Sequence, residues 1–138
     1  MSIIERIGVL QGELELFDEP LQKYEYIIEL GHDLPPLEEA YRSELYRVQG
    51  CQSTVWLHPF EKEGKLYFEA DADALIVRGL VQILIRIFSG ATAQEIVSTD
   101  RKLLERLGLS EIITAGRQNG VASMLGRIYG FAQERIDG

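Results

Sequence analysis

The chain has 138 residues, of which 46% are hydrophobic and 26% are charged, and this composition is typical of one soluble globular domain. Its 22 acidic and 14 basic residues give a formal net charge of -8, which disfavours binding to nucleic acid or to an anionic membrane surface. We therefore expect a single domain over residues 1–138, with neither nucleic acid nor membrane as a partner.

No export signal is expected at the start of the chain. Met1–Arg6 lacks a basic region followed by a long apolar run. The most apolar segment, Ala74–Phe88, is interrupted by two arginines and is shorter than the ~20 residues that span a bilayer. Because the chain also has one unpaired cysteine, we expect a cytoplasmic location.

The N-terminal part of the chain favours two helices. One helical face is indicated by the apolar spacing of Ile3, Ile7, Leu10 and Leu14. A second helix is predicted from about Glu19 to Leu30, and Gly31 is a plausible C-terminal stop. The residues predicted for its inner stripe are Leu21, Tyr24, Ile27 and Ile28. Pro35-Pro36 then begins an irregular connection, because proline disfavours a helix.

The middle of the chain changes to an extended pattern rich in β-branched and aromatic residues. The predicted strands are Leu45–Val48, Thr54–Phe60 and Leu66–Glu69. Glu61–Gly64 has the composition of a hairpin loop between the last two. This pattern predicts a three-stranded antiparallel sheet, with Cys51 in the turn between its first two strands.

The remainder favours helices. Asp73 is a candidate cap for a helix that begins at Ala74, whose single polar stripe indicates burial on most sides. Three further helices are predicted at Thr92–Val97, Asp100–Leu107 and Gly116–Arg135. Together these elements predict an α+β fold, in which helices pack on one face of the three-stranded sheet.

Cys51 is the only cysteine, so it has no internal disulfide partner. A lone thiol can act as a nucleophile or carry one small group, but free cysteine is also among the most buried residue types. Residue type alone therefore favours a packed side chain. Efficient attack needs a lowered pKa or an incoming base, and Arg47 and Arg117 are candidates for nearby positive charge.

Other chemistry has less support from the residues. Metal binding is disfavoured because His32 and His58 lack ligand spacing with Cys51. The pair Asp71 and Asp73 has residue types suited to acid–base chemistry, but helix capping is the favoured interpretation. Glycines spaced by four in the last helix indicate close packing against a neighbouring element: Gly116 with Gly120, and Gly126 with Gly130.

A longer motif gives the lone cysteine a context. Val48–Trp56 has the form V-x-G-C-x-S-x-V-W, and in this segment the chain closely resembles the SufE family of sulfur-acceptor proteins. The resemblance continues in Tyr24–Gly31, Leu34–Leu37, Arg42, Asp71–Ala74, Ile76–Leu80, and Arg117 with Gly120.

This resemblance implies an α+β fold shared with iron–sulfur scaffold proteins, of SufE/IscU-like type. It implies that Cys51 accepts persulfide sulfur from a cysteine desulfurase, stimulates that enzyme and passes the sulfur to an iron–sulfur assembly scaffold. The implied supporting residues are Gly50, Gln52, Ser53 and Arg117, and the implied partner-binding residues are Asp71 and Asp73.

The implied partners are a SufS- or CsdA-like desulfurase and a SufBCD-like scaffold. Pyridoxal phosphate would belong to the desulfurase, so no cofactor is expected in this chain, which would act as a monomer or homodimer. A carrier should also protect its cargo from small thiols. We therefore expect Cys51 to lie in a largely apolar, shielded pocket from which the turn swings out on partner binding.

Two alternatives remain open at this stage. The chain could be a non-catalytic acidic adaptor, in which Cys51 is only a buried structural residue. It could also be a cysteine hydrolase that uses His58 as its base, although no orienting group is evident.

Overall fold

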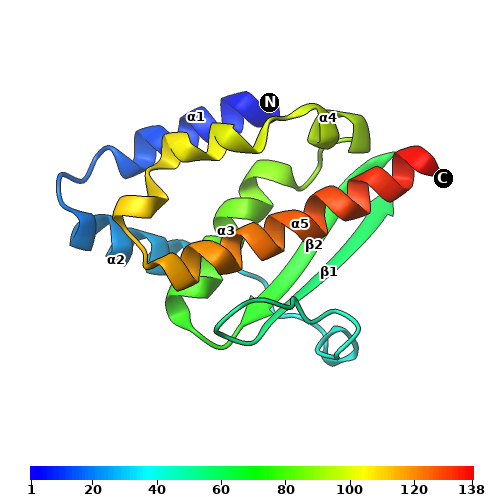
Figure 1. Ribbon diagram of the computed structural model, residues 1–138, viewed down its shortest axis with the longest axis horizontal. Helices are drawn as coiled ribbons and strands as arrows, with labels where there is room; N and C mark the ends of the chain where they lie inside the picture. The colour runs from blue at the N-terminus through cyan, green and yellow to red at the C-terminus, as the bar shows by residue number, and fades with distance from the viewer.

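An antiparallel hairpin and a layer of helices make up the structure, a computed structural model that describes residues 1–138 (Figure 1). The α-helices are α1 (Ile3–Leu14), α2 (Pro20–Gly31), α3 (Leu75–Phe88), α4 (Ala93–Ser98) and α5 (Ala115–Asp137). The strands are β1 (Val55–Lys62) and β2 (Lys65–Ala72). Short 3-10 helices are η1 (Glu39–Tyr41), η2 (Arg101–Leu107) and η3 (Leu109–Glu111). The α+β class predicted from the sequence is confirmed.

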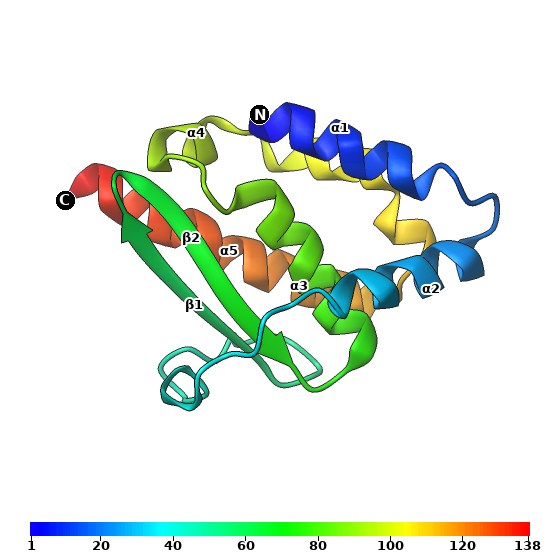
Figure 2. The same ribbon diagram turned by 180° about the vertical axis from the view of Figure 1, so that it is seen from behind.

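Helix α1 follows its sequence pattern closely. Ser2 caps it in a reciprocal capping box with Glu5, and the four predicted inner residues are all buried. It lies beside η2 at one edge of the helical layer (Figures 1 and 2). The first predicted helix is thus confirmed together with its inner face.

The hairpin is closed by a two-residue turn. Glu63 and Gly64 both have positive φ, as a type I′ hairpin turn requires, and Val55 pairs with Ala72 at the other end of the ladder. The helices cover the face of the sheet that carries Val55 and Leu57 from β1 and four alternating residues of β2. The buried residues of β2 are Leu66, Phe68, Ala70 and Ala72.

The predicted third strand does not form, so the sheet has two strands. Residues 43–46 curl into a turn, with hydrogen bonds from Tyr46 N to Ser43 O (3.1 Å) and from Arg47 N to Glu44 O (3.3 Å). Only a single bridge, between Arg47 and Trp56, remains of the predicted pairing with β1. The local turn bonds therefore compete successfully with an extended ladder at this position.

Helix α3 is the centre of the helical layer, and α2 crosses it at very close range. A Cβ on Gly79 would lie 1.9 Å from Ile27 O, and one on Gly31 would lie 2.7 Å from Gly79 N. Helix α2 ends at Gly31 as predicted, but Gly31 is not among the glycines with positive φ, and its close contact with α3 is a further role that the sequence did not indicate. Leu21 is 66% exposed and does not join the inner stripe, whereas Ile27 is fully buried.

Helix α5 runs across the layer from the thiol segment to the hairpin turn, where Arg135 pairs with Glu61 at 3.8 Å (Figure 1). The predicted short helix after Thr92 forms as α4, and Asp100–Leu107 forms as η2, closed by Gly108 at φ 67°. None of the helices is both long and apolar enough to cross a membrane.

Candidate functional site

Cys51 lies in a loop whose two ends are joined at the base. Val48 N donates to Val55 O at 2.8 Å, and Leu57 N donates to Tyr46 O at 2.9 Å. These two bonds close residues 49–54 into a short loop, which we call the Cys51 loop. The backbone turns at Gly50, whose φ of 88° is readily adopted by glycine but strained in a residue that has a Cβ. The predicted position of Cys51 in a turn is therefore correct, although the segment before it is not a full strand.

The thiol points into a very small pocket between this loop, α3 and α5. The pocket walls are Val77, Leu80 and Met124 together with the backbone of Gly116 and Gly120. Its volume is ≈ 10 Å³, which is about the space of a single water molecule. The sulfur lies 3.7 Å from Gly120 O, within the distance of a weak thiol hydrogen bond. Cys51 is thus shielded and half-buried in a mostly apolar environment.

Burial raises the pKa of the Cys51 thiol above its usual value. Of the two arginines considered from the sequence, Arg117 lines the pocket, but its guanidinium donates to Ser53 Oγ at 2.5 Å. Arg47 instead pairs with Glu44 at 3.2 Å and is not part of the pocket wall. Burial in the closed structure therefore favours the neutral thiol over the thiolate.

The predicted supporting residues do come together around Cys51. Gln52 and Ser53 line the pocket with Arg117. The Gln52 side chain packs directly against Gly116, because a Cβ on Gly116 would lie only 2.5 Å from Gln52 Cδ. Gly50 packs against α5, because a Cβ on Gly50 would lie only 2.5 Å from Ser123 Oγ. These contacts fit the loop to the surface of α5.

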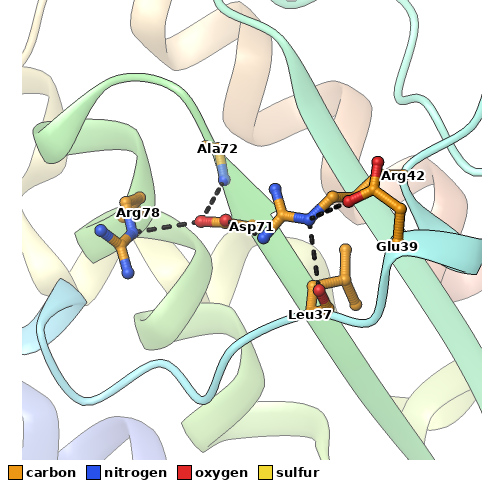
Figure 3. Close-up of polar contacts among 6 residues, drawn as sticks. All are labelled: Leu37, Glu39, Arg42, Asp71, Ala72 and Arg78. Carbon is orange, nitrogen blue, oxygen red and sulfur yellow. Dashed lines mark hydrogen bonds and ion pairs between the residues drawn. The ribbon is translucent and has the colours of Figure 1, made fainter.

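The Asp71 carboxylate forms ion pairs with two arginines of the same chain (Figure 3). Its carboxylate lies 2.7 Å from Arg42 Nη2 and 3.1 Å from Arg78 Nε, and its side chain is 18% exposed. Arg42 also donates to Leu37 O at 3.2 Å. Asp71 therefore joins β2 to α3 and to the segment before the Cys51 loop, and this internal pairing limits its access to a partner.

Asp73 does not cap the following helix, contrary to the prediction. The N-cap position of α3 is Ala74, which makes no side-chain cap. Asp73 Oδ1 instead accepts a hydrogen bond from Thr54 N at 3.2 Å, while Asp73 N donates to Thr54 O at 3.1 Å. Asp73 is exposed and anchors the last residue of the Cys51 loop. Partner binding through Asp71 or Asp73 stays a prediction.

Sequence reasoning missed the walls of the pocket. Val77 and Leu80 are separated by three residues on α3, and Gly116, Gly120 and Met124 are separated by four on α5. The expected close packing is correct for Gly116 and Gly120 but wrong for Gly126 and Gly130, which have nothing near them. The glycine spacing was thus a usable signal of a flat helix surface, but it did not identify the loop that covers it.

The remaining candidates lie away from the thiol. The His58 ring stacks on Tyr41 with centroids 3.6 Å apart, and its Nδ1 lies 3.0 Å from Glu69 Oε1 on the outer face of the sheet. It does not line the Cys51 pocket, which lies on the helical side. A wider hollow of ≈ 380 Å³ lies between η2, η3 and α5, and it contains neither cysteine nor histidine. No group of three or more metal-ligating side chains is assembled in the structure.

Comparisons with known proteins agree on one family. The family model for SufE, described as an Fe-S metabolism associated domain, matches residues 9–132. An uncharacterised SufE-like protein of Rhizobium meliloti (strain 1021) is 40% identical over 129 residues, covering 90% of this chain and 92% of that protein. An uncharacterised SufE-like protein of Rhizobium etli is 42% identical over 118 residues, covering 82% of this chain and 80% of that protein.

The fold also has a solved counterpart. The solution structure of a hypothetical protein from Thermus thermophilus has a TM-score of 0.79 and covers 96% of this chain and 97% of that chain, at 18% identity. At this identity the likeness concerns the fold alone. The sequence matches carry the further conclusion: this chain belongs to the SufE family of Fe–S metabolism associated domains.

Proposed function

We propose that the protein is a sulfur carrier, which accepts persulfide sulfur on Cys51 from a pyridoxal-phosphate-dependent cysteine desulfurase. The observation that carries this proposal is the placement of the only thiol of a SufE-family chain under a short loop, in a pocket too small for a second reactant. Such a pocket stores a thiol and excludes small molecules from it. The pyridoxal phosphate belongs to the desulfurase.

The transfer is an exchange at sulfur. The Cys51 thiolate attacks the outer sulfur of the persulfide on the desulfurase, forming a new sulfur–sulfur bond while the old one breaks. The desulfurase cysteine leaves as a thiolate, and no external oxidant or reductant is consumed. Because the desulfurase thiol is released, its next turnover can begin, which accounts for stimulation of the enzyme. A second exchange of the same kind would pass the sulfur to an iron–sulfur assembly scaffold.

Burial sets the order of events. The raised pKa of Cys51 keeps the thiol protonated in the closed structure. When the desulfurase draws the Cys51 loop outward, water and partner groups reach the sulfur, and the cost of forming the thiolate falls. The thiol thus becomes reactive only where the donor persulfide is present, and small thiols in solution have little access to the cargo.

The direct test is intact-mass measurement after incubation with a cysteine desulfurase and free cysteine. A gain of one sulfur atom, lost on treatment with a reductant and mapped to Cys51, is the expected result. Cys51→Ser is the matched control, since it changes one atom of the side chain and should gain no sulfur. Absence of the adduct with every desulfurase from the protein's own source would overturn the proposal.

One observation favours a second candidate, a non-catalytic adaptor: Cys51 is half-buried and has a raised pKa, as a packed cysteine would. The Cys51→Ser protein separates the two. A carrier variant binds the desulfurase but fails to stimulate it, whereas an adaptor variant does both as well as the unmodified chain.

A further inference from the structure

Arg127 reaches from α5 to the segment that enters the Cys51 loop. Its Nη1 donates to Arg47 O at 2.9 Å, and its Nη2 donates to Leu45 O at 3.4 Å. These carbonyls lie 80 and 82 residues away in the sequence. One guanidinium therefore connects the middle of the last helix to the first hinge of the loop.

Backbone hydrogen bonding explains why these two carbonyls are available. Tyr46 O accepts from Leu57 N at 2.9 Å, whereas the next carbonyl, Arg47 O, has no backbone donor. Leu45 O belongs to the turn of residues 43–46 and also has no backbone donor. Arg127 donates to both of these carbonyls.

The first hinge is held to β1 by the two backbone bonds at its base and by packing of the Tyr46 ring, which meets Tyr41 and His58 edge to face. The side chains on the other side of this segment, Glu44, Leu45 and Arg47, are exposed and contribute little packing toward α5. Beyond the hinge, the thiol contact to Gly120 O is long, at 3.7 Å. The far end of the loop is better secured, because Ser53 accepts from Arg117 and Thr54 is paired with Asp73. Arg127 thus supplies the side-chain hydrogen bonds that link the first hinge to α5.

We propose that Arg127 is a positioning residue for Cys51: it pins the first hinge of the Cys51 loop to α5 and so keeps the thiol closed until a partner binds. The inference rests on the proposed sulfur-carrier function for its biological meaning. Its structural content concerns the free protein alone. Opening would then be confined to residues 49–54, which move about a fixed base while residues 46–48 stay paired with β1.

The experiment compares Arg127→Ala with Arg127→Lys in the full chain. Loss of both donors should increase the rate at which a bulky thiol reagent labels Cys51 in the free native protein by about threefold to tenfold, the range given by one or two modest hydrogen bonds. The lysine variant keeps a cationic donor and should recover part of the protection. Amide hydrogen exchange at Val48 and Leu57, which close the loop base, should accelerate in Arg127→Ala, while exchange in α2 and α3 stays unchanged.

Two control variants separate this effect from general loss of stability. Arg135→Ala removes an arginine of the same helix that contacts Phe131 and Glu61 near the hairpin turn, and it should leave labelling of Cys51 unchanged. Glu13→Gln weakens the ion pair with Arg86 between α1 and α3, and it should lower the urea midpoint without selective exchange at Val48 and Leu57.

Labelling and exchange that stay at the unmodified level in Arg127→Ala would overturn the proposal. Exchange that accelerates equally throughout the protein would also overturn it, because Arg127 would then be a general stabilising residue. Neither measurement uses a desulfurase, so each outcome is independent of the sulfur-transfer test. If the carrier function also holds, persulfide loaded on Cys51 should be discharged by a small thiol faster in Arg127→Ala than in Arg135→Ala.

Discussion

The contact between α2 and α3 and the contact between the Cys51 loop and α5 are both made possible by glycine, but they differ in strength. At the first, Gly31 and Gly79 let two helices meet backbone to backbone over buried side chains such as Ile27. At the second, Gly116 and Gly120 provide a flat surface on which a short and partly exposed loop rests. The helices are held by packing, whereas the loop is held by a few polar contacts.

This difference separates the most tightly packed region from the segment that carries the only thiol. A closely packed helix pair opens only with large parts of the core, while a segment with few buried contacts can open locally at low cost. Cys51 lies in the lightly held segment, and α3 and α5 provide the opposite walls of its pocket. The loop opening that we propose would therefore not require unfolding of these helices.

The sharpest way to break the rigid contact is Gly79→Ala. Its new Cβ would lie 1.9 Å from Ile27 O, and the backbone of α2 has to move to relieve the clash. We expect the free energy of unfolding to fall by about 3 kcal/mol or more, measured by urea denaturation. The matched control is Gly126→Ala on α5, which has nothing near it and should gain about 0.5–1 kcal/mol. Equal stability of the two variants would contradict the close crossing.

A change at the loop should have a smaller effect on stability and a larger effect on the thiol. Gly50→Ala forces a β-carbon into φ 88° and toward Ser123 Oγ, so we expect a loss of about 1–2 kcal/mol in urea denaturation. Labelling of Cys51 should accelerate as well. Gly64→Ala has a similar φ of 81° in the hairpin turn but no neighbour, so it should lose stability without exposing the thiol. Equal labelling in both variants would show that Gly50 does not seat the loop.

The smallest expected effect is on how the free energy of unfolding depends on pH, through the ion pair between Glu13 of α1 and Arg86 of α3. Hydrogen bonds from Arg86 hold the pKa of Glu13 below its usual 4.5, and Tyr26 also donates to this carboxylate. A lowered folded-state pKa contributes stability that is present above the unfolded pKa and is lost as pH falls through the folded one. Glu13→Gln should therefore be less stable by about 0.5–1 kcal/mol at pH 7, because the pair is partly exposed.

The difference between Glu13→Gln and the unmodified chain should shrink as the pH falls below 4.5. Urea midpoints from pH 7 down to pH 3 would measure this change. The matched control is Glu15→Gln, an exposed residue that follows the same helix, and its urea midpoint should lie close to that of the unmodified chain at pH 7. A constant difference for Glu13→Gln over the whole range would show that the carboxylate is not the group that titrates.

Much of the fold could be predicted because its signals are local. The spacing of Ile3, Ile7, Leu10 and Leu14 predicts α1, and Glu61–Gly64 predicts the hairpin loop. The turn itself is shorter than predicted, because Glu61 and Lys62 continue β1 and only Glu63 and Gly64 have positive φ. The third strand was wrong because turn bonds between residues 43 and 47 are invisible in a pattern of apolar residues. Leu21 was misplaced for a similar reason, since helical spacing alone does not show which edge of a stripe faces the core.

The candidate site divides in the same way. The lone thiol, its glycine and its neighbours Gln52 and Ser53 are contiguous, and their motif could be recognised without a structure. Asp71 and Asp73 were identified as a pair, but their contacts with Arg42, Arg78 and Thr54 depend on which segments lie side by side. Arg127 had no signal at all, because its partners are backbone carbonyls 80 and 82 positions earlier in the chain.

The sequence by itself therefore determined the helices, the hairpin and the family to which the Cys51 motif points, since periodicity, turn chemistry and motif identity are properties of neighbouring residues. A shielded thiol was already expected, but only the tertiary structure decided which residues enclose it, which arginines contact its loop and which acidic residue stays exposed. These features depend on how α3 and α5 pack against the hairpin, because packing brings together groups that are far apart in the chain.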